Sequence, residues 1–321
     1  MGVRRTWLVA LALVPATFPA GAVAAAPKPP LRSVGTPENA NAVLTGRRMA
    51  AFRDPAGTIH LYHDGHGWRA ITAPSTCDGR PAALRAVGSG LALFEARCDD
   101  SAPPAGLVLR VATGAVTPAA PFGNESERPG GDWLDAIGAH WVKVLSWGYH
   151  WHDRRYVDWR TGAVKHEDDA GSHRYPNLDR PGLFAPICRP LRRRENLDDD
   201  AYDNGPPWLY YDQAGGWGVT QLKEYATRAN QPTLVLQRCG ARRPRIELPW
   251  GVLGRGIVAW AEPRGGVEYR VHVLRLRDGR RFSWRANAWQ SPVVSVAGRR
   301  VFVTGEFYDH RTRVLSARIP R

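Results

Sequence analysis

One short phrase recurs along the chain and constrains the fold more than any other feature. It consists of an apolar residue, a glycine, two variable residues and an apolar run. The copies are LTGRRMAAF (44–52), AVGSGLALF (86–94), AIGAHWVKVL (136–145), VLGRGIVAW (252–260) and SVAGRRVFV (295–303). The glycines lie 42, 50, 116 and 44 residues apart, and the long interval holds a degenerate copy, QAGGWGVTQ (213–221). Such a spacing indicates a repeat architecture.

Each copy precedes a segment of alternating apolar residues, a tight turn and a short strand. Four of these turns contain dipeptides that favour antiparallel hairpins: Asp64-Gly65, Thr113-Gly114, Thr161-Gly162 and Asp278-Gly279. Capped helical periodicity is almost absent, and prolines are scattered throughout. Each unit is therefore predicted to be an antiparallel meander of four strands.

Four-stranded units repeated around an axis predict an all-β fold, a β-propeller of six blades. The last unit ends at TRVLSARIPR without a fourth strand, and PLRSVG (30–35) is predicted to complete it. We expect residues 1–24 to be a signal peptide, 25–40 an N-terminal segment that completes the last blade, and 41–321 a single propeller domain. A seven-bladed ring and a two-domain β-sandwich are the alternatives.

The first residues predict export. Arg4 and Arg5 precede an apolar run, and Ala22-Val23-Ala24 fits a cleavage signal. The run is short for a membrane span and is interrupted by prolines. We expect a secreted protein that is soluble after cleavage, with no stable membrane insertion.

The cysteine count agrees with export. The four cysteines form no C-x-x-C motif, so they predict two disulfides rather than a zinc site. Three pairings are possible. We favour Cys77–Cys98 and Cys188–Cys239, because each pair then falls in neighbouring strands of one unit.

The chain carries a formal net charge of +14, and almost all of its positive side chains are arginine rather than lysine. Arginine binds phosphates and carboxylates in a fork and stacks on aromatic faces. A basic exported protein is attracted to anionic envelope polymers. We expect such a polymer or a saccharide as partner, no nucleic acid, and a monomer.

The export signal, the pair ICRPLRRR and LVLQRCGARR, and strands such as GRGIVAW carry a resemblance. On these features the chain resembles uncharacterised exported β-propeller-like proteins of GC-rich bacteria, over most of its mature length. The resemblance implies a propeller fold and carries no assigned activity.

The stretch SWGYHWHDRRYVDW (146–159) is rich in aromatic residues and histidine. HWHD (150–153) is predicted to be the tip of the hairpin between the second and third strands of its unit. Such tips lie on one face of a propeller with the connections between blades, here 119–132 and 166–182, and loops on a rigid scaffold often carry function. We therefore expect a ligand-binding rim of these residues: Tyr149, His150, Trp151, His152, Tyr225, Tyr308 and His310.

A metal centre is the alternative for this tip. His150, His152 and Asp153 could begin one if His173 or His310 completed it. We favour a rim without metal and expect no cofactor. The five acids in RRRENLDDDAYDNG (192–205) leave calcium as an alternative, although they do not match known calcium-loop spacing.

The function predicted from these features is that of an exported, non-catalytic propeller that binds a saccharide, a peptide or an anionic wall polymer on its loop face. The alternative is a hydrolase or lyase acting on a carbohydrate or lactone in the central channel. The acids nearest that face are Asp135, Asp158, Glu224, Glu262 and Glu306.

Overall fold

Every element of the described chain is a β-strand. The computed structural model describes residues 28–39, 43–76, 78–96, 105–122, 132–148, 151–166, 169, 174–186, 208–214, 216–222, 234–239, 245–248 and 251–320. In this part of the chain the strands form six four-stranded antiparallel sheets and one two-stranded sheet. The all-β class and the four-stranded meander predicted from the repeats are confirmed.

Three of the four-stranded sheets come from the first half of the chain. The first contains β2 (Leu44–Gly46), β3 (Met49–Arg53), β4 (Ile59–His63) and β5 (Gly67–Ile71). The second contains β6 (Ala83–Gly88), β7 (Leu91–Ala96), β8 (Ala105–Arg110) and β9 (Val116–Pro118). The third contains β10 (Asp132–Ile137), β11 (Trp141–Gly148), β12 (Trp151–Asp158) and β13 (Val164–His166).

The remaining sheets follow in chain order. The two-stranded sheet pairs β14 (Arg174–Pro176) with β15 (Phe184–Pro186). The next sheet contains β16 (Trp208–Ala214), β17 (Trp217–Leu222), β18 (Leu234–Arg238) and β19 (Arg245–Leu248). It precedes the sheet of β20 (Val252–Gly254), β21 (Ile257–Gly265), β22 (Glu268–Arg275) and β23 (Arg281–Asn287). The last sheet contains β24 (Val293–Ala297), β25 (Arg300–Glu306), β26 (Thr312–Arg318) and β1 (Arg32–Gly35).

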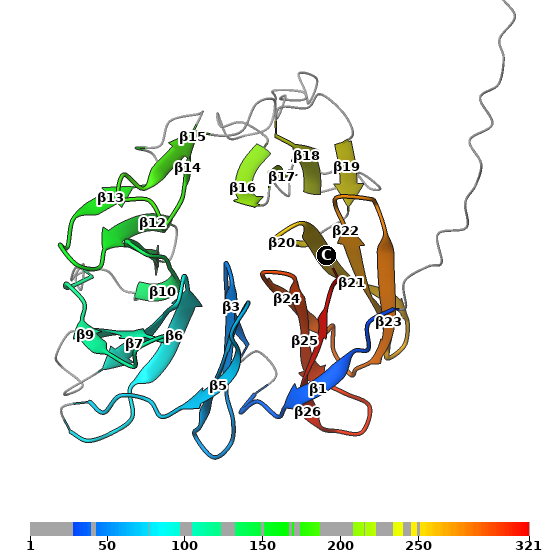
Figure 1. Ribbon diagram of the computed structural model, residues 1–321, viewed down its shortest axis with the longest axis horizontal. Coiled ribbons are helices and arrows are strands. Elements are labelled where there is room, and N and C mark those ends of the chain that lie inside the picture. The colour runs from blue at the N-terminus through cyan, green and yellow to red at the C-terminus, as the bar shows by residue number, and fades with distance from the viewer. Residues whose placement is uncertain are drawn as a thin grey trace, which may run out of the picture.

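The sheets succeed one another around a common centre, which is a β-propeller arrangement (Figure 1). The first strand of each four-stranded sheet is the inner one, and inner strands of neighbouring sheets touch, as β2 does with β6 and β6 with β10. Second strands such as β7 are buried along their whole length, whereas outer strands such as β5 and β9 are mostly exposed. This order from buried to exposed explains why the apolar runs of the repeats fall on the first two strands.

The N-terminal segment joins the end of the chain. β1 pairs antiparallel with β26, so it forms the outer strand of the last sheet (Figure 1). The Trp284 indole also donates a hydrogen bond to the Pro29 carbonyl at 3.0 Å. The segment predicted to complete the last unit, residues 30–35, therefore contains the strand that pairs with β26.

The hydrophobic core lies between neighbouring sheets rather than in one central mass. One cluster joins the first two sheets, a second joins the second and third, and others continue in chain order. A further cluster packs Phe52 and Tyr62 of the first sheet against Phe302 and Val314 of the last. The first and last units therefore share apolar contacts although they are far apart in sequence.

The repeated glycines lie where one unit meets the next. A Cβ at Gly46 would lie 2.8 Å from the Cα of Gly88, and closer still to the Val87 carbonyl oxygen. A Cβ at Gly88 would likewise meet the carbonyl of Ile137, and one at Gly254 would meet Val296. Glycine is thus required because the backbone of the next unit occupies the space of a side chain.

Residues 174–186 differ from the prediction. The sequence placed 166–182 among the loops on the face that carries the HWHD tip. Residues 177–183 instead join β14 to β15, and Leu178 accepts a hydrogen bond from His140 in the β10–β11 turn, on the opposite face. The segment has no copy of the glycine phrase, so its strands left no repeat signal.

Two further observations concern the cysteines and the membrane. Cys239 is disulfide-bonded, and the other three cysteines lie outside the described residues. Within the part of the chain that the structure covers, there is no helix with the length and apolarity that a membrane crossing needs.

Candidate functional site

The antiparallel meander gives the propeller two distinct faces. Hairpins that join the second and third strands of each sheet lie at one end, with the connections between sheets; we call this end the loop face. Hairpins that join the first and second strands lie at the other end, which we call the turn face. The loop face carries the exposed side chains of Trp289 and Tyr308, and the turn face carries the turns that contain Arg47, Arg48 and Arg255.

An exposed aromatic platform lies on the loop face of the last sheet. It consists of Trp289, Tyr308 and His310. The Trp289 ring stacks on the Tyr308 ring with centroids 5.4 Å apart, and on the His310 ring at 5.2 Å. Trp289 is 45% exposed and Tyr308 60%, so the apolar rings face solvent instead of filling a core. Exposed apolar patches on soluble proteins often mark binding sites.

Backbone hydrogen bonds hold the platform in place. Trp289 donates its N–H to the Glu306 carbonyl at 3.0 Å, and Tyr308 donates to the Asn287 carbonyl at 2.9 Å. A β-bridge between Ala288 and Phe307 lies between these bonds. The connection from β23 to β24 is therefore fixed against the β25–β26 hairpin, which holds the backbones that carry the three rings in one arrangement.

The hairpin that carries Tyr308 and His310 is a tight turn. His310 has a φ of 58°, a left-handed conformation that histidine adopts more readily than most residues. Its N–H donates to the Phe307 carbonyl at 2.9 Å, and Asp309 forms an ion pair with Arg313 across the hairpin. The His310 Nδ1 lies 3.6 Å from Glu306 Oε1. The platform thus has hydrogen-bonding and acidic groups along its edge.

The structure brings together two of the seven predicted rim residues, Tyr308 and His310. Tyr149, His150 and Tyr225 lie outside the described residues. Trp151 and His152 are the first residues of β12, and their backbones pair with Gly148 and Trp147. The strand pairing therefore continues further than the predicted tip at 150–153 and leaves only residues 149 and 150 between the paired positions.

Trp289 was missed by the sequence analysis. It lies in the short connection AWQSP, which interrupts no repeat and contains no motif. A large aromatic residue beside glutamine, serine and proline in a connection between two units is the only sequence signal for it. Its position next to Tyr308 depends on backbone bonds between 287–289 and 306–308, which sequence alone does not show.

A pairing of an aromatic residue with histidine recurs across the second and third strands. His60 stacks on Phe52 with centroids 4.8 Å apart, and its Nε2 lies 2.8 Å from Asp54 Oδ2. The hydrogen bond from His60 is the main cause that lowers the pKa of the Asp54 carboxyl. His152 and Trp147 occupy the same cross-strand relation in their sheet.

The second example of this pairing is in β21 and β22. His272 stacks on Trp260 with centroids 5.0 Å apart, and its Nε2 lies 2.9 Å from Glu262 Oε2. Burial lowers the pKa of His272 against the opposing effect of the Glu262 charge. Both histidines, His60 and His272, pack between an aromatic ring and a carboxylate. Their contacts are those of residues that stabilise the sheet.

The acids considered for hydrolysis are engaged where the structure describes them. Asp135 forms an ion pair with Lys143 at 2.7 Å. Asp158 accepts hydrogen bonds from the N–H groups of Arg160 and Thr161 in the turn after β12. This turn lies on the turn face, so the expectation that Asp158 lies near the loop face is wrong. Glu262 and Glu306 each lie beside a histidine, as described above. Glu224 lies outside the described residues. Among the described residues, no group of three metal-ligating side chains converges.

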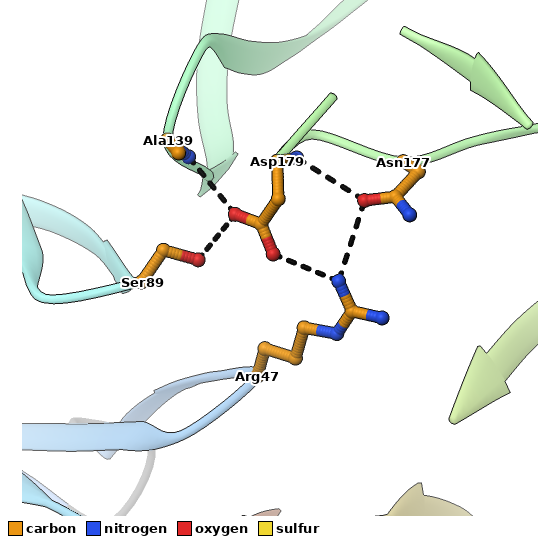
Figure 2. Close-up of polar contacts among 5 residues, drawn as sticks. All are labelled: Arg47, Ser89, Ala139, Asn177 and Asp179. Atoms are coloured by element: carbon orange, nitrogen blue, oxygen red, sulfur yellow. Dashed lines mark hydrogen bonds and ion pairs between the residues drawn. The ribbon is translucent and has the colours of Figure 1, made fainter. Parts of the chain in front are cut away.

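A second polar cluster lies on the turn face and surrounds Asp179 (Figure 2). Its carboxylate accepts hydrogen bonds from the Ala139 N–H at 2.9 Å, from Arg47 Nη1 at 2.8 Å and from the Ser89 hydroxyl. Asn177 Oδ1 also accepts from Arg47 at 3.3 Å. The turn between β14 and β15 is thereby tied to the first turns of the three preceding sheets.

The charge of Asp179 is stabilised by this cluster. Burial opposes its ionisation, but the hydrogen bonds from Ser89, Ala139 and Arg47 outweigh burial and hold the pKa of its carboxyl below the usual value. Because these donors occupy both oxygens, Asp179 is a structural acceptor rather than a proton donor for catalysis. No residue of this cluster was singled out from the sequence.

No known protein-family profile matches the chain, and no curated protein sequence does. Solved structures similar to it include the β-propeller domain of the Trilobed protease from Pyrococcus furiosus, at 9% identity and a TM-score of 0.45, covering 91% of this chain and 96% of that one. TolB from Acinetobacter baumannii has 14% identity and a TM-score of 0.35, with 84% of this chain and 63% of that chain covered.

The AtxE2 isopeptidase is also similar, at 13% identity and a TM-score of 0.38, with 91% of this chain and 51% of that chain covered. The chain thus spans less than two thirds of the length of the TolB and AtxE2 structures. At these identities and TM-scores the similarities carry no argument about ligand or chemistry. The description of the fold rests on the strand pairing itself.

Proposed function

We propose that this protein is an exported, non-catalytic β-propeller that binds a ligand through its loop face. The observation that carries the proposal is the platform of Trp289, Tyr308 and His310, whose exposed rings are fixed by backbone hydrogen bonds. The propeller is proposed to be closed, with six full blades and the β14–β15 hairpin as an additional segment between the third and fourth. Residues 1–24 are proposed to be removed on export.

A saccharide fits the platform best among the ligand classes expected from the sequence. Flat aromatic rings offer an apolar surface, and the nearby carboxylate, imidazole and phenol groups offer hydrogen bonds to hydroxyls. A short peptide is the second fit, since aromatic residues dominate protein interfaces as well. An anionic polymer fits less well here, because the Glu306 carboxylate lies beside His310 at the edge of the platform and would repel it.

The hydrolase alternative has less support from the described residues. Asp135, Asp158, Glu262 and Glu306 each have a partner within the protein. Release of reducing ends from a bound glycan by the purified protein would favour that alternative over binding alone.

The proposal is tested by a binding screen. The purified mature protein is applied to an array of glycans, peptides and envelope polymers, and the ligands that bind are measured again with Trp289→Ala and Tyr308→Ala. Exposed aromatic anchors of an interface cost about 2 kcal/mol or more when truncated, which is roughly 30-fold in affinity. Val116→Ala, an exposed apolar change on the outer strand β9, is the matched control and should bind as the parent does.

The proposal is wrong if the parent binds no member of the array. It is also wrong if a ligand binds equally to the parent and to both aromatic variants, since the binding site then lies elsewhere. Melting temperatures of all variants, measured in parallel, confirm that each remains folded.

A further inference from the structure

The turn face carries a group of arginines that the binding proposal does not use. We call Arg48, Arg255, Arg299, Arg300 and Arg318 the arginine cluster. They come from turns and strand ends of three sheets, those of β2–β5, β20–β23 and β24–β26. Arg48, Arg255 and Arg318 are exposed.

Backbone hydrogen bonds bring these turns together. Arg255 donates its N–H to the Gly298 carbonyl at 2.8 Å, and Gly298 donates to the Arg47 carbonyl at 3.2 Å. Gly298 has a φ of 62° and packs against Asp64, so its turn is closely fitted between the other two. The arginines on either side of these bonds therefore belong to one continuous surface.

Three of the arginines lie around Tyr62 and Asp64, and of these three Arg318 is the one that approaches the Asp64 carboxylate. Arg48 Nη2 donates to the Asp64 carbonyl at 3.3 Å, and Arg318 Nη2 lies 4.0 Å from Asp64 Oδ1. The Arg300 guanidinium lies 4.8 Å from the centre of the Tyr62 ring, whose hydroxyl donates to Asp64 Oδ1 at 3.4 Å. The Asp64 side chain is only 8% exposed, so it offers little negative charge to the surface.

Among the described residues, the charges of Arg48, Arg300 and Arg318 are only partly balanced by Asp64. Arg300 lies directly opposite Arg318 across β25 and β26. Like charges opposite one another in a sheet destabilise it. Asp64 provides a single negative charge among Arg48, Arg300 and Arg318. An external anion would offset the remaining repulsion.

We propose that the arginine cluster binds a linear polyanion whose charges are phosphate groups. The guanidinium group recognises phosphate through paired hydrogen bonds and remains charged at any physiological pH. Because the guanidinium groups come from three sheets, they fit a chain of repeated phosphates better than they fit a single small anion. The turn face thus takes the anionic ligand, and the loop face, with its acids beside the platform, takes a different one.

The experiment measures binding of fluorescently labelled linear polyphosphate of defined length by anisotropy, over a series of salt concentrations. The parent should bind, with an affinity that falls steeply as salt rises. Arg255→Gln should weaken binding about tenfold, and Arg255→Gln combined with Arg318→Gln about a hundredfold. Because Arg255 contributes its main-chain N–H to the fold, its side chain can be changed without removing a structural bond.

The matched controls are Arg311→Gln, and Arg311→Gln combined with Arg270→Gln, exposed arginines in the β25–β26 hairpin and in β22. These control variants lose the same number of positive charges at positions outside the arginine cluster. They should bind polyphosphate as the parent does, and so should Trp289→Ala. Equal losses in both sets would show that net charge alone drives binding and would overturn the proposal.

Two other outcomes also overturn it. Competition by orthophosphate at equal phosphate concentration would indicate a site for one small anion. Binding to vesicles that contain anionic phospholipid, with the same dependence on Arg255 and without binding to polyphosphate, would assign the cluster to a lipid surface.

Discussion

Gly46→Ala tests the explanation given for the repeats. The new Cβ would lie 2.8 Å from the Cα of Gly88 and closer still to the Val87 carbonyl oxygen, where real Cβ atoms are essentially never found. Backbone atoms cannot rotate away as a side chain can, so β2 and β6 must separate. Overpacking of this kind costs about 1–3 kcal/mol and sometimes more.

Gly182→Ala is the matched control. Gly182 is exposed, has no atom within 4 Å of an added Cβ, and does not adopt a positive φ. Its replacement should be neutral or should stabilise the protein by about 0.4–1 kcal/mol, because it restricts the unfolded chain. The free energy of unfolding would be measured by urea titration followed by tryptophan fluorescence.

We expect Gly46→Ala to be less stable than Gly182→Ala by about 2 kcal/mol or more, from the two effects together. Equal stabilities for the two variants would refute the claim that repeated glycines admit the backbone of the next unit. A change confined to the slope of the titration would instead indicate an altered unfolded state.

Three further predictions concern charge, cross-links and the aromatic tip. Asp179→Asn should lower the free energy of unfolding by about 1–3 kcal/mol at neutral pH. Because folding lowers the pKa of this carboxyl, the difference in stability from the parent should shrink as pH falls below about 4. Urea titrations at several pH values would check this. Peptide mapping without reductant should find Cys77–Cys98 and Cys188–Cys239, each contributing about 3–4 kcal/mol; a free thiol or another pairing contradicts this. The double change of His150 and His152 to alanine should alter stability by less than about 0.5 kcal/mol, and a chelator should leave the parent's melting temperature unchanged; large and matching decreases would indicate a structural metal.

The repeats were predictable because they are local. A glycine, an apolar run and a turn dipeptide each reflect contacts within one unit or with the next, so 86–94 and 252–260 predicted the strands found there. The degenerate copy at 213–221 likewise falls on β16 and β17. The incomplete last unit pointed to residues 30–35 because a fourth strand was needed beside β26.

The turn-face clusters were not predictable in the same way. Asp179 and Arg47 are 132 residues apart and belong to segments without a common motif. The β14–β15 hairpin has no glycine phrase, and its turn was assigned to the wrong face for that reason. Contacts of this kind depend on how far each sheet rotates around the axis, and no residue pattern records that rotation.

The loop-face site was predictable in part. Tyr308 and His310 follow from the position of a hairpin tip, which the strand order determines. Trp289 does not, because its direction depends on hydrogen bonds between a connection and a hairpin. The sequence placed Tyr308 and His310 on the loop face, where the structure has them, and the position of Trp289 beside them required the three-dimensional structure. The binding role of this platform stays a prediction.

Hydrogen exchange with and without bound ligand shows whether the platform of Trp289, Tyr308 and His310 is the binding site. The strongest uncharged ligand from the binding screen is added to the mature protein, and amide exchange is followed by mass spectrometry. If the ligand binds there, we expect slower exchange in residues 287–292 and 306–312, with no change in the turns at 47–48 and 255–256. Protection of the turn face instead, or saturation with ligand without protection at 287–292 and 306–312, would contradict this assignment.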